Sequence, residues 1–165
     1  MCGQKFAIYH VSFANTYVLN AALGRMYARA ASNRFRDRKF DFEDLIDWDS
    51  SKSEKAMIFE WAGFAFSSED TKPFLNGEMD PLLRKEQAFL RIFRDVAAPY
   101  WIIAAAAGDD ETLRHEFVHC VYMAFPDYRA EVREFLSTLK LKTARKRLCA
   151  MGYSRRNHLD ELNAY

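Results

Sequence analysis

Residues 100–124 constrain the fold more than any other part of this 165-residue sequence. They open with the apolar run YWIIAAA at Tyr100–Ala106, which is short enough to predict a buried strand. Gly108 and the three acidic residues after it supply a turn, a helix cap and first-turn carboxylates. We therefore expect a strand, a tight turn and then a helix that runs to about Ala124.

The predicted helix carries the string His115-Glu116-Phe117-Val118-His119. Histidines four positions apart lie one turn above each other on one helix face, so both imidazoles can reach a single cation. Glu116 falls beside such a cation rather than on it, where its carboxylate can accept a proton from water. A second, apolar stripe is expected to bury the other side of the helix, and its members are Leu113, Phe117, Cys120, Val121 and Ala124.

A catalytic zinc site usually has three protein ligands and one open position, so a third ligand is expected from elsewhere in the chain. Glu161 is the first choice, because its segment has a helical pattern and returns after two intervening helices. His158, three positions earlier on the same predicted face, is an alternative ligand or a hydrogen-bonding group near the reaction centre. Glu131 and Glu134 are weaker candidates, since a solvent-facing position explains them more simply. The expected zinc ligands are His115, His119 and Glu161.

The remaining pattern predicts one α+β domain over residues 1–165, with a small mixed sheet packed against a helical bundle that includes the histidine helix. Before that helix we expect a strand at 5–13, a helix at 17–35, a surface connection at 36–54, one or two strands at 56–66, a loop at 67–77 and a helix at 80–95, opened by a cap at Asp80 and by Pro81. After it we expect helices at 126–136, 141–150 and 157–165.

Charge and hydropathy indicate which classes of binding partner are disfavoured. Lys and Arg total 24 against 23 Asp and Glu, and this balance gives no long-range attraction to nucleic acid or to anionic membrane. Basic residues cluster locally at Arg34, Arg36, Arg38 and Lys39, and at Lys140, Lys142, Arg145, Lys146 and Arg147. The second cluster has helical spacing that is more typical of a solvated face, so nucleic-acid binding there is the less favoured alternative. The longest apolar stretch, residues 96–107, is too short to span a bilayer, and we expect no membrane partner.

Three cysteines, Cys2, Cys120 and Cys149, are an odd number without regular short spacing, which argues against a disulfide scaffold. With no signal-peptide pattern at the start, a cytoplasmic, reducing location is expected. Cys120 should point toward the apolar stripe as a core residue. Met1-Cys2-Gly3 resembles the start of amidotransferases that use an N-terminal cysteine nucleophile, although nothing downstream supports that alternative.

The H-E-F-V-H string and the late D-E-L-N-A-Y segment resemble the gluzincin group of zinc peptidases in their compact, single-domain form. Residues 100–165 also resemble a set of phage and bacterial proteins with a similar strand, G-D-x-x-T-L-x-H-E-x-x-H and a D-E-x-x-A-Y helix, and D-P-L-L-R-K-E-Q from Asp80 fits the same set. The resemblance covers about half of the chain. It implies a metal-binding, peptidase-like core, with Glu161 on the helix that supplies the third ligand.

The expected function is zinc-dependent hydrolysis of a peptide bond in a peptide or protein substrate. Glu116 would act as general base, and His158, Tyr128 or Tyr165 would donate a hydrogen bond to the developing oxyanion. The strand at Tyr100–Ala106 would offer an edge to an extended peptide, with room left by its small alanines. The alternative is a non-catalytic, zinc-stabilised protein-binding module, possibly tied to nucleic acid, with the aromatic residues of 36–66 as its contact surface. The sequence leaves the oligomeric state open.

Overall fold

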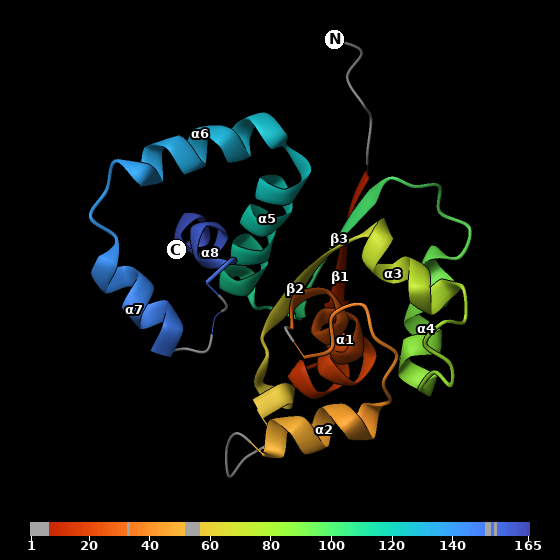
Figure 1. Cartoon of the computed structure of the whole chain (residues 1–165). Helices are drawn as coiled ribbons and strands as arrows, with labels where there is room; N and C mark the ends of the chain where they lie inside the picture. The colour runs from red at the N-terminus through yellow and green to blue at the C-terminus, as the bar shows by residue number, and fades with distance from the viewer. Residues whose placement is uncertain (1–6, 33, 52–56, 151–152, 154) are drawn as a thin grey trace.

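A three-stranded sheet organises the fold of the computed structural model, which describes residues 7–32, 34–51, 57–150, 153 and 155–165 (Figure 1). Strand β1 (Ala7–Phe13) pairs in parallel with β3 (Tyr100–Ala106), and β2 (Gly63–Ser67) pairs antiparallel with the other edge of β3. The strand order is therefore β1-β3-β2. The expectation that β3 offers a free edge is wrong, because its two neighbours occupy both edges.

Helices cover both faces of β3. Its register pairs Phe64 with Ala104 on the face that packs into the main core with helix α1 (Thr16–Ala31). The next pair, Gly63 with Ala105, lies on the opposite face, against helix α5 (Asp110–Ala124). Burial on both faces is the physical reason that β3 is a continuous apolar run rather than an alternating one. Its alanines pack beneath these elements rather than leaving room for a substrate.

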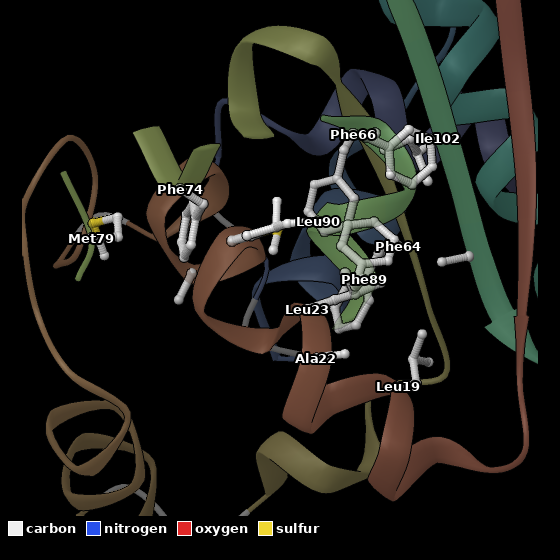
Figure 2. Close-up of a cluster of buried hydrophobic side chains, with 14 of the residues drawn as sticks. Leu19, Ala22, Leu23, Phe64, Phe66, Phe74, Met79, Phe89, Leu90 and Ile102 are labelled. Atoms are coloured by element: carbon white, nitrogen blue, oxygen red, sulfur yellow. The ribbon is translucent and has the colours of Figure 1, made fainter. Parts of the chain in front are cut away.

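The main core is rich in aromatic side chains and joins α1 to the sheet and to helices α3 (Ser68–Leu75) and α4 (Arg84–Phe93). Figure 2 shows part of this cluster, which includes Leu19, Leu23, Phe64, Phe66, Phe74, Phe89, Leu90 and Ile102. These side chains come from α1, β2, α3, α4 and β3, so they fix the sheet that supports α5.

A buried ion pair links α1 to α4 beside this core. Arg25 Nη1 lies 3.1 Å from Glu86 Oε2, and both side chains are almost fully buried. The other terminal guanidinium nitrogen, Nη2, donates to the carbonyl oxygens of Phe40 at 2.8 Å and Met79 at 2.7 Å. The buried charge is thus both paired and hydrogen-bonded, as its burial requires.

Four expectations for the first half of the chain are wrong or hold only in part. Residues 36–54 contain helix α2 (Phe42–Ser50) instead of a plain connection, because Asp41 and Asp44 form a capping box at its start. Residues 67–77 contain α3, which a reciprocal Ser67 and Asp70 cap begins and which holds Pro73 inside. The first part of 56–66 is a short 3₁₀ helix, η1 (Met57–Glu60), before β2, and residue 56 lies outside the described residues.

The fourth concerns the start of α4. That helix begins at Arg84 rather than at Pro81, because the backbone N–H of Leu83 donates to Glu86 Oε2 at 2.8 Å and caps the chain there. Helix α1 also ends at Ala31, four residues before the expected boundary.

The second half follows the expectation closely. Helices α6 (Pro126–Ser137), α7 (Lys142–Ala150) and α8 (His158–Ala164) come after α5 within one or two residues of the expected limits. Helix α5 lies between the sheet and α8, and α7 packs on α8 at the side of the molecule away from the sheet (Figure 1). The mixed α+β class is confirmed. Among the described residues, no helix combines the length and the apolar character needed to cross a membrane.

Candidate metal centre

Three side chains from two helices converge on one point. His115 and His119 come from α5, and their Nε2 atoms lie 3.0 Å apart. Glu161 comes from α8, and its Oε2 lies 3.7 Å from each of those nitrogens. Ligands about 2.1 Å from a tetrahedral zinc ion stand about 3.4 Å from one another, so these three separations bracket the required geometry. The structure thus brings together all three residues expected as metal ligands.

Helix α5 can place its histidines there because it comes very close to β2 at Gly63. A β-carbon on Gly63 would lie 2.8 Å from Cγ of Glu116 and 3.0 Å from the carbonyl oxygen of Ala104, and it would collide with Cγ2 of Thr112. Only glycine allows this approach of backbone to helix. Gly63 therefore sets the position of the histidine helix relative to the sheet.

Asp160 supports the second histidine. Its Oδ1 lies 2.9 Å from Nδ1 of His119, which directs the Nε2 of that ring toward Glu161 and leaves it free for a cation. Burial lowers the pKa of His119, but the contact with Asp160 and the negative charges of Asp160, Glu161 and Glu116 together outweigh this effect and raise it. By contrast, burial and the neighbouring His119 lower the pKa of His115. The sequence offered a signal for Asp160, since a carboxylate adjacent to a third ligand is well placed to orient a histidine.

One ligand atom of the cluster lacks a partner that a cation would supply. Glu161 Oε2 is buried without a hydrogen-bond partner among the described residues. Burial, above all, raises the pKa of Glu161 to about 7, and it does the same for Glu116. Two carboxylates and two imidazoles in one partly dry site are unfavourable without a counter-charge. The donor set therefore fits a divalent cation held by two imidazole nitrogens and one carboxylate oxygen.

Comparison with known proteins gives no relative for this chain. It matches no family model, no curated protein and no solved structure. The likeness to gluzincins therefore stays a prediction, and the chemistry of the site is argued from its own geometry.

A cleft of about 490 Å³ opens onto the cluster between the end of α1, β2, α5 and α8. Glu116 lines this cleft beside the histidines, yet it is not one of the three converging ligands. The cleft is also lined by the aromatic side chains Tyr27, Trp61, Phe64, Tyr153 and Tyr165.

Two tyrosines that the sequence did not indicate lie at the cluster. A hydrogen bond from Tyr153 counteracts the burial that raises the pKa of Glu161. Burial, followed by the charges of Glu161 and Glu116, raises the pKa of Tyr27, so its hydroxyl stays protonated at neutral pH. Tyr27 reaches the site from α1 through packing, whereas Tyr153 lies in the segment just before α8, and no local pattern marks either of them.

Tyr165, expected near the reaction centre, lies beside the candidate metal ligands. Its ring centroid is 4.8 Å from that of His115, and its hydroxyl is 3.5 Å from the hydroxyl of Tyr153. Its side chain is largely exposed at the mouth of the cleft. It is therefore available to a bound molecule.

His158 does not join the cluster. It is the first residue of α8, and its Nε2 donates to the carbonyl oxygen of Tyr153 at 3.2 Å and lies 3.8 Å from Cys149 Sγ. The ring therefore faces α7, outside the cleft, and the expectation of a ligand or catalytic role is corrected. The spacing of three residues from Glu161 was misleading, because the His158 ring is hydrogen-bonded to the segment before the helix instead of following the helix face.

Helix α6 contributes no side chain to the cluster. Tyr128 donates to Asn163 Oδ1 at 2.9 Å and does not line the cleft. Glu131 and Glu134 are exposed on the same helix. The weaker candidates for a third ligand and for an oxyanion donor on α6 are therefore set aside.

The cysteines and the apolar stripe of α5 follow the expectation in part. Cys120 is buried as expected, whereas Phe117 of the supposed buried stripe is 45% exposed. Cys2 lies outside the described residues, so its suggested role as a nucleophile stays a prediction.

Proposed function

We propose that this chain is a zinc-dependent metallopeptidase. The observation that carries the proposal is the convergence of His115, His119 and Glu161 at one point of an open cleft, with Glu116 beside them. Two imidazoles and a carboxylate form a common ligand set of catalytic zinc, and three protein ligands leave a position for water or substrate. When bound, zinc would supply Lewis acidity, which polarises a carbonyl group and makes water more acidic.

The protein's own residues would do the remaining work. Glu116 would accept the proton of the attacking water and then deliver it to the leaving amine. Tyr165, beside His115, would donate a hydrogen bond to the oxygen that becomes negative. Asp160 would hold the His119 ring in the ligating orientation throughout.

The edge of β2 is the best-placed support for an extended substrate. Ala62, Gly63, Phe64 and Ala65 line the cleft, and β2 pairs with β3 along one edge while its other edge is unpaired within the described residues. A peptide that adds as a strand forms backbone hydrogen bonds that do not depend on its sequence. We therefore place the substrate backbone along β2 rather than along β3.

Metal analysis and a proteolysis assay test the proposal together. Purified protein should hold one zinc per chain and cleave fluorescein-labelled casein. Glu116→Gln should keep the zinc and lower turnover by at least about 10²-fold, the low end for loss of a general base. His115→Ala should lose the zinc itself.

The outcomes separate the two candidate functions. If the protein binds one equivalent of zinc but cleaves no casein above the level of Glu116→Gln, the non-catalytic protein-binding module is favoured. Protein that binds no zinc from a zinc-sufficient medium would contradict both.

A further inference from the structure

A second hollow of about 680 Å³ lies between the end of α6, α7 and the start of α8. Its cations are Lys142, Arg145 and Lys146 from α7 and Arg155 from the segment before α8. We call these four residues and the space between them the basic hollow. Leucines form its apolar part, and none of the described residues that line it is a carboxylate. Helix α8 contributes to both sites, but its carboxylates Asp160 and Glu161 line the metal cleft instead.

The four cations of the basic hollow have no ion-pair partner among the described residues. All four are exposed, and none forms an ion pair within the part of the chain that the structure describes. Exposed lysines and arginines usually gain little from a nearby carboxylate, but here not even that weak compensation is present. Their mutual repulsion would be relieved by a ligand that carries several negative charges.

The near-neutral net charge of the chain hides a strong separation of charge. Residues 135–159 hold seven Lys and Arg and no Asp or Glu. The other 140 residues hold 17 Lys and Arg against 23 Asp and Glu. Exposed charges beyond about 8 Å are screened at physiological salt, so a partner at the basic hollow experiences the local positive charge rather than the total.

The other basic cluster of the sequence, at residues 34–39, has no such local excess of positive charge. Residues 34–49 hold four Lys and Arg but six Asp and Glu. The acids begin with Asp37, which lies within the cluster, and continue into α2. That region is therefore a mixed surface, whereas the basic hollow is not.

We propose that the basic hollow binds the phosphate backbone of nucleic acid without reading its base sequence. Lys142 and Lys146 stand one turn apart on α7, about 6 Å along the helix axis, which is close to the rise of two nucleotides of one strand. Arg145 lies on the same side, since it is three positions from Lys142. Backbone phosphates need only such cations, and they supply closely spaced negative charges in return.

The chemistry of α7 favours nucleic acid over a membrane or an acidic protein. Its exposed residues are Lys142, Thr143, Arg145, Lys146, Arg147, Cys149 and Ala150. None of these offers the large apolar side chain that an interfacial membrane helix inserts between lipids, and the exposed Leu139 of the hollow belongs to the loop before α7. Nor do they offer the aromatic anchors on which protein interfaces usually depend. The proposal is independent of the metal centre, and nucleic acid would bind whether or not the chain is a peptidase.

Fluorescence anisotropy with a labelled 24-base-pair DNA duplex of arbitrary sequence tests the proposal on the full chain. Binding should weaken steeply with salt, with log K falling against log[salt] at a slope of about −3 to −4, because about four phosphates are neutralised. Duplexes of different sequence should bind within about threefold of one another. A slope near zero for the unaltered chain would by itself overturn the proposal.

Matched variants locate the contact. Combining Lys142→Ala, Arg145→Ala and Lys146→Ala should weaken binding at least about 30-fold at low salt and reduce the slope by about three. Combining Arg34→Ala, Arg38→Ala and Lys39→Ala removes the same charge from the mixed surface and should change binding by less than about threefold. Equal losses in both variants would overturn the proposal by showing that net charge alone matters. So would tight binding to anionic phospholipid vesicles together with no binding to the duplex. Unchanged zinc content and melting temperature in the first variant would show that it folds.

Discussion

Both ring nitrogens of His119 are used. Its Nε2 points to the cluster, and its Nδ1 lies against Asp160, the residue directly before the third ligand. Helix α8 therefore supplies both a ligand, Glu161, and the residue that orients another ligand, His119. A histidine held in this way loses little freedom when a cation binds, which favours a tight site.

Asp160→Asn should weaken zinc binding by about 10- to 100-fold, because the amide has no charge with which to polarise and orient the imidazole. Competition with a chromophoric chelator measures the affinity. Asp127→Asn is the matched control, since Asp127 is exposed on α6 and does not line the cleft. Equal affinities in the two variants would remove Asp160 from its supporting role.

Tyr165→Phe should lower kcat on casein by about 10²-fold while zinc content stays at one equivalent, because the variant loses a hydroxyl that would donate in the transition state. Steady-state kinetics of the zinc-loaded protein measure this. A change in KM alone would assign the hydroxyl to substrate binding instead.

At the scale of elements, the contact between β2 and α5 determines the site. Gly63→Ala should destabilise the protein by about 1–3 kcal/mol through overpacking and weaken zinc binding, since α5 or β2 must shift to accept the new methyl group. Urea unfolding and the chelator competition measure the two effects.

The control for this variant is Gly77→Ala. Gly77 has a φ of 79°, so alanine is strained there, but the residue lies between α3 and α4 and does not line the cleft. It should lose comparable stability and keep its zinc affinity. Loss of zinc affinity in both variants would mean that general instability, rather than the position of α5, is responsible.

The elements that were predicted correctly carry their signals locally. Asp109 caps α5 by accepting from the backbone N–H of Thr112 at 3.0 Å, and the two histidines follow at helical spacing. In contrast, α3 holds Pro73 and is followed by Gly77, which suggested a loop. The capping residues of α2 and α3 were present in the sequence, but charged and interrupted patterns masked them.

The residues of the site also fall into those that local sequence patterns predict and those that they do not. The ligands on α5 follow from spacing on one helix, and Glu161 followed from the order of the helices. Gly63 and Tyr27 could not be inferred, because their places in the cleft depend on how β2 and α1 pack in three dimensions. The role of His158 was wrong for a local reason, the bond of its ring to the Tyr153 carbonyl.

At the scale of the whole molecule, a bound cation would join α5 to α8. A ligand that binds only the folded state at about 100 times its Kd adds about 2.7 kcal/mol of stability. For a chain of this length we expect zinc to raise Tm by about 5–10 °C over protein treated with a chelator. Differential scanning calorimetry measures this shift, and His115→Ala should abolish it. If zinc raises the Tm of His115→Ala by the same amount, the stabilising zinc binds at another site.

The ligands are also far apart in the order of synthesis. Glu161 follows His115 by 46 residues, so a ribosome working at about 5–20 residues per second adds it several seconds after the first histidine. During that interval the growing polypeptide carries an incomplete ligand set. Under the proposed function, each nascent chain would therefore stay inactive until α8 has been made and has docked against α5.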